Sequence, residues 1–308
     1  MMKAVQIFKT GSSDVLTYGD APKPTLKPEH VLIKVYAIGL NPVDYKIRSS
    51  PQLPPNMDFP AILGWDISGV VEESASDLFK SGDEVYGMVN FISPAGAYAE
   101  YVLAPASHIA YKPETLDHIQ SAGIPLAALT AHQAFERSQL SEGQRVLIHA
   151  GAGGVGHFAV QLAKLRGAYV ITTASERNHE FLRGLGADEI IDYRKVNFEK
   201  VVRDVDVVLQ TIGGATAEKS VQTVKDGGII VSIVGDENIQ RERNLQVHSI
   251  LVEPSASQLK QLAQWIDKGE LRVNIQETFP LENMIQAHDK LATGRTRGKI
   301  VVEVETLG

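Results

Sequence analysis

The chain of 308 residues, 44% hydrophobic and 22% charged, has the length of two domains and the composition of a globular protein. Acidic residues outnumber basic ones by 37 to 30, and the net charge of -7 argues against nucleic acid or an anionic membrane as the main partner. There is no cysteine, which excludes disulfides, thiolate nucleophiles and cysteine-ligated zinc or iron–sulfur clusters.

No segment approaches the roughly 18 uninterrupted apolar residues of a membrane helix. The short apolar stretch near the start, within residues 1–9, predicts a first strand and is too short for a secretion signal. We therefore expect a cytoplasmic protein without a membrane partner.

The first third of the chain consists of short predicted strands separated by turns. Apolar, β-branched runs predict strands over 31–38, 67–71 and 84–89. Clusters of Pro, Gly, Asn and Asp separate these strands, as in residues 51–56 and 81–83. This pattern favours a partly open barrel or a sandwich.

From about residue 121 the pattern changes to alternating helices and strands. Helices are predicted over 121–140, 155–166 and 177–185, and strands over 145–149, 169–173, 189–191, 205–209, 228–233 and 247–252. Apolar runs of Val and Ile that alternate with helices are typical of a parallel sheet covered on both faces. The middle of the chain is therefore predicted to be a doubly wound α/β domain.

The last part of the chain holds a predicted helix over 257–268 and a predicted strand within 298–304. Helical segments separate this strand from the parallel set, so we expect it to return to the first domain. The predicted fold class is α/β, with one domain formed by residues 1–122 and 256–308 and a doubly wound domain, residues 123–255, inserted into it.

A glycine-rich turn follows the strand at 145–149 and opens the next helix. Gly151, Gly153 and Gly156 satisfy Gly-x-Gly-x-x-Gly within a strand–turn–helix–strand unit of the ~30 residues expected for a dinucleotide site. Without β-carbons the backbone can approach a pyrophosphate, and the helix N-terminus presents N–H groups to it. The alternative is a tight turn that serves packing alone. We expect this turn, including Gly154 and Val155, to bind a dinucleotide.

The end of the second strand of this domain distinguishes NAD from NADP. A carboxylate at that position binds the ribose hydroxyls of NAD. The residues found there are Ala174, Ser175, Arg177 and Asn178. A serine hydroxyl and a guanidinium suit a 2′-phosphate, and Tyr193 after the third strand is placed to close that pocket. NADPH is favoured, although Glu176 would oppose it if the register shifted by one residue.

Further motifs follow one another in a fixed order along the chain. They are Gly39–Asp44, Pro60–Asp66, Gly82–Gly87, Ala97–Tyr101, Leu129–Ala131, Ala150–Gly156 and Gly298–Val301. With them the chain resembles the medium-chain dehydrogenase/reductase superfamily, in particular its zinc-free quinone oxidoreductase branch. The resemblance implies a GroES-like barrel domain formed by both ends of the chain, an inserted Rossmann domain, a cofactor in the cleft between them, and a homodimer.

Zinc-dependent members of the superfamily hold their metal with a cysteine near the position of Asn41 and a Gly-His-Glu where this chain has Gly64-Trp65-Asp66. No pair of the nine histidines has metal-ligand spacing, so we expect no metal, with a site assembled only by folding as the alternative. Trp65 is expected in the barrel core. Without zinc to activate the substrate, an intrinsically electrophilic acceptor is the most suitable one. Hydride transfer to it requires only proximity and a few hydrogen bonds.

The resemblance also implies roles for individual residues. Asn41, Asp44 and Tyr45 are implied to be catalytic, although Asn41 and Pro42 also suit the capped start of a short helix. The cofactor contacts implied are Asn41, Pro42, Thr130, Thr211, Ile212, Gly213, Ile233, Val234, Arg297 and Lys299. Gln210 stands where the family usually has Asp. Solvated surface charge is the alternative for Arg297 and Lys299, and a backbone contact within its own helix is the alternative for Thr130.

These features predict an NADPH-dependent quinone oxidoreductase that passes a hydride to a quinone or another α,β-unsaturated carbonyl acceptor. One alternative is a reductase of the double bond of 2-alkenals and enones. Another is an NADPH-binding sensor or accessory protein with little turnover. The predicted partner is a small electrophilic molecule.

Overall fold

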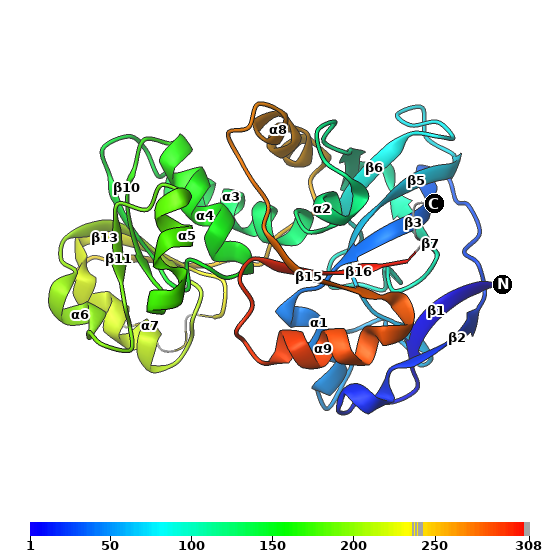
Figure 1. Cartoon of the computed structure of the whole chain (residues 1–308), viewed down its shortest axis with the longest axis horizontal. Coiled ribbons are helices and arrows are strands. Elements are labelled where there is room, and N and C mark those ends of the chain that lie inside the picture. The colour runs from blue at the N-terminus through cyan, green and yellow to red at the C-terminus, as the bar shows by residue number, and fades with distance from the viewer. Residues whose placement is uncertain (236, 238, 240–242, 305–308) are drawn as a thin grey trace. The chain divides into compact units, whose positions relative to one another are not determined.

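The structure is a computed structural model that describes residues 1–235, 237, 239 and 243–304. It contains two compact units (Figure 1): unit 1 is formed by Met1–Leu129 and the described residues from Glu253 onward, and unit 2 by Thr130–Val252. The predicted domain boundaries, at 122/123 and 255/256, lie a few residues from these positions. Among the described residues, no helix is both long and apolar enough to cross a membrane.

Unit 1 is built on two sheets. The smaller sheet has the order β2-β1-β4, and the larger has the order β15-β16-β3-β5-β6-β8, with β7 also pairing with β3. The strands are β1 (Met2–Ile7), β2 (Thr17–Ala21), β3 (His30–Gly39), β4 (Ala61–Ile62), β5 (Asp66–Ser74), β6 (Glu84–Met88), β7 (Tyr101–Pro105), β8 (Ile109–Tyr111), β15 (Ile275–Pro280) and β16 (Lys299–Glu303).

The last strand of the chain joins the sheet of the first part, as the sequence predicted. Val301 to Glu303 on β16 pair antiparallel with Gly39 to Ala37 on β3, and β15 pairs parallel with β16 on the other side. In Figure 1 the red strand β16 accordingly lies beside the blue strand β3. Ile300, Val301 and Val302 are fully buried, so hydrophobic burial holds the C-terminal strand in place.

The helices of unit 1 cover this sheet and its ends. They are α1 (Pro42–Ser49), α2 (His118–Ala122), the start of α3 (Pro125–Ser138), α8 (Ala256–Asp267) and α9 (Met284–Ala292), with short 3-10 turns at Ser13–Val15, Ala106–His108 and Leu281–Asn283. Trp65 is fully buried, as predicted. Its indole Nε1 donates a hydrogen bond to the Ser93 carbonyl at 3.0 Å, which satisfies its only polar atom.

Unit 2 is a six-stranded parallel sheet with the order β11-β10-β9-β12-β13-β14. The strands are β9 (Arg145–Ile148), β10 (Tyr169–Thr173), β11 (Glu189–Ile191), β12 (Val205–Gln210), β13 (Val224–Ser232) and β14 (Gln246–Ser249), and the helices are the rest of α3, α4 (Gly154–Leu165), α5 (His179–Gly184), α6 (Phe198–Val201) and α7 (Ala215–Ser220). The predicted doubly wound fold is confirmed.

The core of unit 2 explains why its strands are continuous apolar runs. Leu147, Ile171 and Val208 on three adjacent strands pack with Phe198 and Val221 in one buried hydrophobic cluster. Helix α4 packs on β9 and β10, and its side chains from Gly156 to Ala163 are buried. Because both faces of such a parallel sheet are covered, its strands do not alternate between polar and apolar residues.

Three predicted elements differ from those observed. The single helical segment expected over 121–140 is divided into α2 and α3, because Pro125 has no N–H for a helical bond and begins a new helix. The helix expected over 177–185 starts as a 3-10 turn, Glu176–Asn178, before α5. The strand expected over 247–252 is the shorter β14, which ends at Ser249, and Pro254 follows soon after it.

Close backbone packing within unit 1 gives a test of this fold. A β-carbon at Gly69 on β5 would lie 2.1 Å from the Lys34 carbonyl oxygen on β3, whereas one at Gly19 on β2 would meet nothing within 4 Å. Gly69→Ala should therefore lower the free energy of unfolding by about 1–3 kcal/mol. Gly19→Ala, the control, should leave it within about 1 kcal/mol. Thermal and urea unfolding measure both, and equal effects would contradict the pairing of β3 with β5.

Candidate functional site

The predicted phosphate-binding turn joins β9 to α4. Ala150 has a positive φ of 50°, which costs a residue with a β-carbon roughly 1–2 kcal/mol. Its carbonyl accepts a hydrogen bond from the Gly153 N–H at 2.9 Å, and the Gly151 N–H donates to the Thr173 carbonyl at 3.1 Å. Gly153 then caps α4 with an extended backbone. The chain reverses here within four residues, and the first turn of α4 follows at once.

The three glycines of the turn have different surroundings. A β-carbon at Gly151 would lie 2.0 Å from the Thr172 hydroxyl, and one at Gly156 would lie 2.2 Å from the Ala150 carbonyl oxygen. At Gly153 the nearest atom within 4 Å is that same oxygen, at 3.2 Å, and nothing else is close. Gly151 and Gly156 are therefore required by the packing of the turn, while Gly153 leaves an open approach to the backbone at the positive end of α4. This is the cradle that a pyrophosphate requires.

The other cofactor residues predicted in unit 2 follow the carboxyl ends of neighbouring strands. The chain order reverses between β9 and β12, because β10 and β11 lie on one side of them and β13 and β14 on the other. Ligands of open α/β sheets bind at this switch point. One edge of the sheet thus gathers the turn after β9, Ala174–Asn178 after β10, Tyr193 after β11, Thr211–Gly213 after β12, and Ile233 and Val234 after β13.

The segment after β10 lacks a carboxylate at the strand end. Ala174 and Ser175 are both buried there, and the Asn178 amide donates to the Ser175 hydroxyl at 3.5 Å. Glu176, the acid that complicated the sequence analysis, is paired with Lys195 at 2.7 Å on the surface. Arg177 and Tyr193 are exposed. The arrangement offers hydroxyl, amide and guanidinium groups for a 2′-phosphate, which fits NADPH better than NADH.

Gln210 stands where the family usually has Asp, and its side chain makes a hydrogen bond within its own loop. Its side-chain amide donates to the Ile212 carbonyl, and its Oε1 is buried without a partner among the described residues. The Thr211 hydroxyl donates to the His149 carbonyl at 2.7 Å, which ties this loop to the start of the phosphate-binding turn. Ile212 and Val234 are exposed at the same edge of the sheet.

Unit 1 contains a second group of predicted site residues, around the start of α1. Asn41 is the N-cap residue and Pro42 the first helical residue, as predicted, and the Asn41 N–H donates to the Asp44 carboxylate at 2.6 Å. The Asn41 side chain is turned elsewhere. Its amide nitrogen donates to Asp66 at 2.9 Å, and its oxygen accepts from the Lys299 ammonium at 2.5 Å.

Lys299 and Asp66 form a buried ion pair at 3.7 Å, with side chains 3% and 0% exposed. The second Asp66 oxygen accepts the Leu126 N–H at 2.9 Å, at the start of α3. The alternative interpretation of Lys299 as a solvated surface charge is therefore wrong. The sequence shows Asp66 only as part of a motif, because its partners are far away along the chain.

Asp44 lies beside this ion pair and has no exposed surface. Its predicted catalytic role stays a prediction. Next to it, the Tyr98 hydroxyl bonds to His288 Nε2 at 3.0 Å, and Arg48 is buried nearby. Tyr98 and His288 are missed by local patterns, since they lie on separate segments of unit 1.

Burial dominates the electrostatics of this cluster. It raises the pKa of Asp44 to about 7, against the Asn41 N–H, the Tyr98 hydroxyl and the charge of Lys299, while Asp66 raises it further. Burial also raises the pKa of Asp66 to about 6 and lowers that of Lys299, each partner opposing the shift of the other. The pKa of His288 falls to about 3 through burial and Arg48. His288 is therefore neutral at physiological pH.

The remaining predicted residues have more ordinary surroundings. Tyr45 is half-buried on α1, where its carbonyl accepts the Ser49 hydroxyl at 2.8 Å. Arg297 is half-buried, and its carbonyl accepts the Asn274 amide at 2.9 Å. Thr130 is buried on α3. The catalytic role of Tyr45 and the cofactor roles of Arg297 and Thr130 stay predictions.

The residues at the family's zinc position do not fit a zinc ion. Asn41 and Trp65 stand where cysteine and histidine would bind it, and the Lys299 ammonium already supplies a positive charge to Asp66. Within the described part of the chain, no group of three His, Cys, Asp or Glu residues lies close enough to hold a metal.

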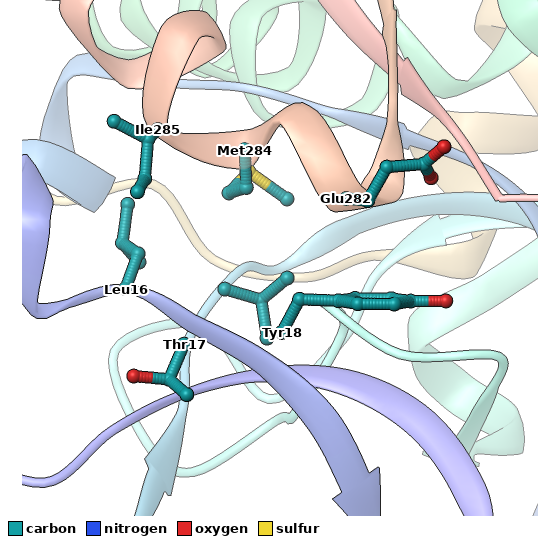
Figure 2. A pocket seen from close by; sticks show the side chains of 7 residues that line it. Leu16, Thr17, Tyr18, Glu282, Met284 and Ile285 are labelled. Carbon is teal, nitrogen blue, oxygen red and sulfur yellow. The ribbon is translucent and has the colours of Figure 1, made fainter.

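Figure 2 shows a pocket elsewhere in unit 1, of about 310 Å³. Its lining comes from β1, from β2 with the residue before it, from the 3-10 turn Leu281–Asn283 and from the start of α9. The lining residues are Val5, Leu16, Thr17, Tyr18, Glu282, Met284 and Ile285. None of these is a predicted site residue. We assign no role in the reaction to it.

The raised pKa of Asp44 predicts a pH-dependent stability. Above its usual pKa of 3.8 and below about 7, the folded protein keeps a proton on this carboxyl that the unfolded chain releases. The contribution of Asp44 to stability thus falls as pH rises through this window, by at most about 1.4 kcal/mol per pH unit. Asp44→Asn abolishes that titration.

Thermal unfolding between pH 5 and pH 8 tests this point. The melting temperature of the wild type, relative to that of Asp44→Asn, should decline as pH rises. Asp58→Asn, at an exposed position, is the control. The difference between its melting temperature and that of the wild type should be the same at every pH in this range. A constant offset for Asp44→Asn as well would show that its carboxyl is ionised throughout.

Comparison with known protein families supports the arrangement described above. Residues 27–114 match the model of the alcohol dehydrogenase GroES-like domain, and residues 185–302 match that of the zinc-binding dehydrogenase domain. The first range lies in unit 1, and the second begins in unit 2 and extends to the C-terminal strand of unit 1.

Relatives resemble the chain over nearly its whole length. A 2-methylene-furan-3-one reductase of Solanum lycopersicum is 35% identical, and a chloroplastic NADPH-dependent alkenal/one oxidoreductase of Arabidopsis thaliana is 36% identical, each across 98% of this chain and 79% of the relative. The structure of a quinone oxidoreductase from Coxiella burnetii, 39% identical, superimposes with a TM-score of 0.93 over 99% of both chains. The chain therefore belongs to the medium-chain dehydrogenase/reductase superfamily, and its relatives there are quinone and enone oxidoreductases.

Proposed function

We propose that this protein is a metal-independent oxidoreductase that uses NADPH to reduce quinones or other α,β-unsaturated carbonyl compounds. The observation that carries the proposal is the open Gly153 cradle at the switch point of the sheet, with no carboxylate at the end of β10. The Arabidopsis relative is named an NADPH-dependent alkenal/one oxidoreductase, which supports NADPH as the reductant. That name and the quinone oxidoreductase from Coxiella support the class of acceptor.

The residues of unit 2 would hold the cofactor. The backbone of Gly151–Gly156 and the N-terminus of α4 bind the pyrophosphate, while Ser175, Arg177, Asn178 and Tyr193 surround the 2′-phosphate. Lys195 pairs with Glu176, which reduces the repulsion between this carboxylate and that phosphate. NADPH, when bound, supplies the hydride.

In unit 1, Asn41 and Tyr45 would contact the acceptor side of the reaction. Hydrogen bonds to Gly39, Asp44, Asp66 and Lys299 hold Asn41 in place, so no free energy is needed to orient it during the reaction. The Tyr45 hydroxyl is proposed to hydrogen-bond the acceptor oxygen as negative charge develops on it. Asp44 then acts as a positioning residue, through the cap of α1.

The absence of zinc ligands restricts the acceptor. A zinc ion acidifies an alcohol or polarises a carbonyl, and Asn41, Trp65 and Asp66 cannot hold one with Lys299 between them. A quinone or an enone is already electrophilic and needs only proximity and hydrogen bonds. The choice between these two acceptors depends on pocket shape. A homodimer and a cytoplasmic location stay predictions from the sequence.

The direct test is the fall in NADPH absorbance with an ortho-quinone, a para-quinone and a 2-alkenal, each repeated with NADH. We expect oxidation of NADPH in preference to NADH, and the best acceptor selects the substrate class. Tight binding of NADPH without oxidation by any acceptor would instead establish the sensor or accessory role.

The glycines of the turn give a matched pair of variants. Gly153→Val should abolish NADPH binding while the protein keeps its melting temperature, because the new side chain occupies the approach to the backbone without a clash below 3.2 Å at its β-carbon. Gly156→Val should destabilise the fold itself, since its β-carbon would meet the Ala150 carbonyl at 2.2 Å. Fluorescence titration and thermal unfolding separate the two effects. Retained affinity in Gly153→Val would overturn the phosphate-binding role.

Arg177 tests the preference for NADPH. Arg177→Ala should raise the Kd for NADPH about tenfold or more, the usual cost of a lost hydrogen bond to a charged group, and should change that for NADH little. Arg183→Ala, at an exposed position on the next helix, is the control and should change neither. An equal loss for both dinucleotides in Arg177→Ala would remove this residue from the 2′-phosphate site.

A further inference from the structure

His149 lies between the end of β9 and the phosphate-binding turn, and nothing above gives it a role. Its ring is 1% exposed and packs edge-on against Phe198, with 4.7 Å between the ring centres. Each ring nitrogen faces one hydroxyl: Nδ1 lies 3.2 Å from Thr173 Oγ1, and Nε2 lies 3.0 Å from Ser220 Oγ. A buried histidine with both nitrogens engaged connects β10 to α7 through itself.

The partners of the two hydroxyls determine the direction of these hydrogen bonds. Ser220 already donates its one proton to the Thr216 carbonyl, at 2.8 Å, so towards His149 it can only accept. The ring therefore carries its proton on Nε2. A neutral imidazole has one N–H, and burial lowers the pKa of His149 to about 4, so Nδ1 is left as an acceptor for the Thr173 hydroxyl.

This direction leaves the Thr173 oxygen free to accept, and the Ala150 N–H lies 3.2 Å from it. Ala150 is the residue with the positive φ, and its carbonyl accepts the Gly153 N–H and stands against Gly156. A continuous chain of hydrogen bonds thus runs from the Thr216 carbonyl through Ser220, His149 and Thr173 to the residue on which the turn depends. Every proton in this chain has one acceptor.

We propose that His149, as its Nε2–H tautomer, is a positioning residue for cofactor binding. By accepting the Thr173 proton at Nδ1, it directs the Thr173 oxygen to the Ala150 N–H and so holds Ala150 in the left-handed conformation that opens the Gly153 cradle. The inference rests on the proposed NADPH binding for its ligand readout only, because the tautomer and the order of the turn belong to the protein alone.

The proposal predicts a rescue that a merely structural role would not give. Thr173→Val keeps the shape of the side chain but removes the hydroxyl, so Ala150 loses the support for its positive φ, and affinity for NADPH should fall roughly tenfold. Glycine adopts positive φ without cost. Adding Ala150→Gly to Thr173→Val should therefore bring the affinity back nearly to that of Ala150→Gly alone, which is the reference for the double variant.

Two further variants complete the binding experiment, which is read by NADPH fluorescence with thermal unfolding alongside. Thr223→Val is the matched control: its buried hydroxyl donates to the Ser220 carbonyl at 2.7 Å, outside the chain to Ala150, and its loss should not change affinity. His149→Phe removes both nitrogens, and its affinity should also fall and recover with Ala150→Gly. This variant serves if Thr173→Val does not fold.

The cofactor-free protein gives an independent readout. Nitrogen NMR of labelled histidine should show His149 protonated on Nε2 and unprotonated on Nδ1 at neutral pH, and the Ala150 amide should exchange with solvent faster in Thr173→Val than in the wild type. A proton on Nδ1, or a failure of Ala150→Gly to restore affinity, would overturn the proposal. If the wild type bound no dinucleotide, the proposed function would fail, and the tautomer and the Ala150 exchange would still decide this inference.

Discussion

The contact between the Ala150 carbonyl and the first turn of α4 is the constraint on which the cofactor site depends. The carbonyl accepts the Gly153 N–H and lies so close to Gly156 that a β-carbon there would be 2.2 Å away. To place it there, Ala150 adopts a positive φ that alanine rarely takes. The N-terminus of α4, where the first N–H groups have no partner within the helix, begins at Gly153, which leaves an open approach. In the proposed function, affinity for a pyrophosphate thus depends on local backbone strain that tertiary contacts sustain.

In unit 1 the central interaction is a different one, the buried ion pair of Lys299 and Asp66. Lys299 comes from the last strand of the chain, Asp66 from the middle of the first part, and Asn41 lies between them. Such a pair adds little net stability, because both charges lose their hydration, but removal of one partner leaves a buried charge uncompensated. The pair fixes where β16 meets α1 and what the Asn41 amide faces. In a position where relatives with zinc hold a metal cation, this chain holds an ammonium group.

The sequence allowed much of this to be predicted, for reasons of local chemistry. Glycine spacing identified the turn, and the alternation of Val and Ile runs with helices identified the parallel sheet. Local patterns also placed Asn41 and Pro42 at a helix start. They failed where a single residue changes the path of the chain, as at Pro125, which divides the helix expected over 121–140.

No local sequence pattern could predict the hydrogen-bond networks that support the site. His149, Thr173 and Ser220 come from three elements that only the sheet brings together, and each residue alone looks like ordinary core. Lys299 seemed as suited to solvent as to a site, because its charge gives no sign of burial. The direction of the Asn41 side chain, away from its helix and towards Asp66, was equally hidden, since capping was the simpler expectation.

The central claim is that this chain transfers a hydride from NADPH to an electrophilic acceptor without a metal. The most direct measurement determines zinc content and NADPH oxidation, with the best quinone or enal, on the same sample before and after prolonged chelation. We expect full activity with zinc far below one per chain in both samples. Stoichiometric zinc whose removal abolishes turnover, and whose return restores it, would contradict the account.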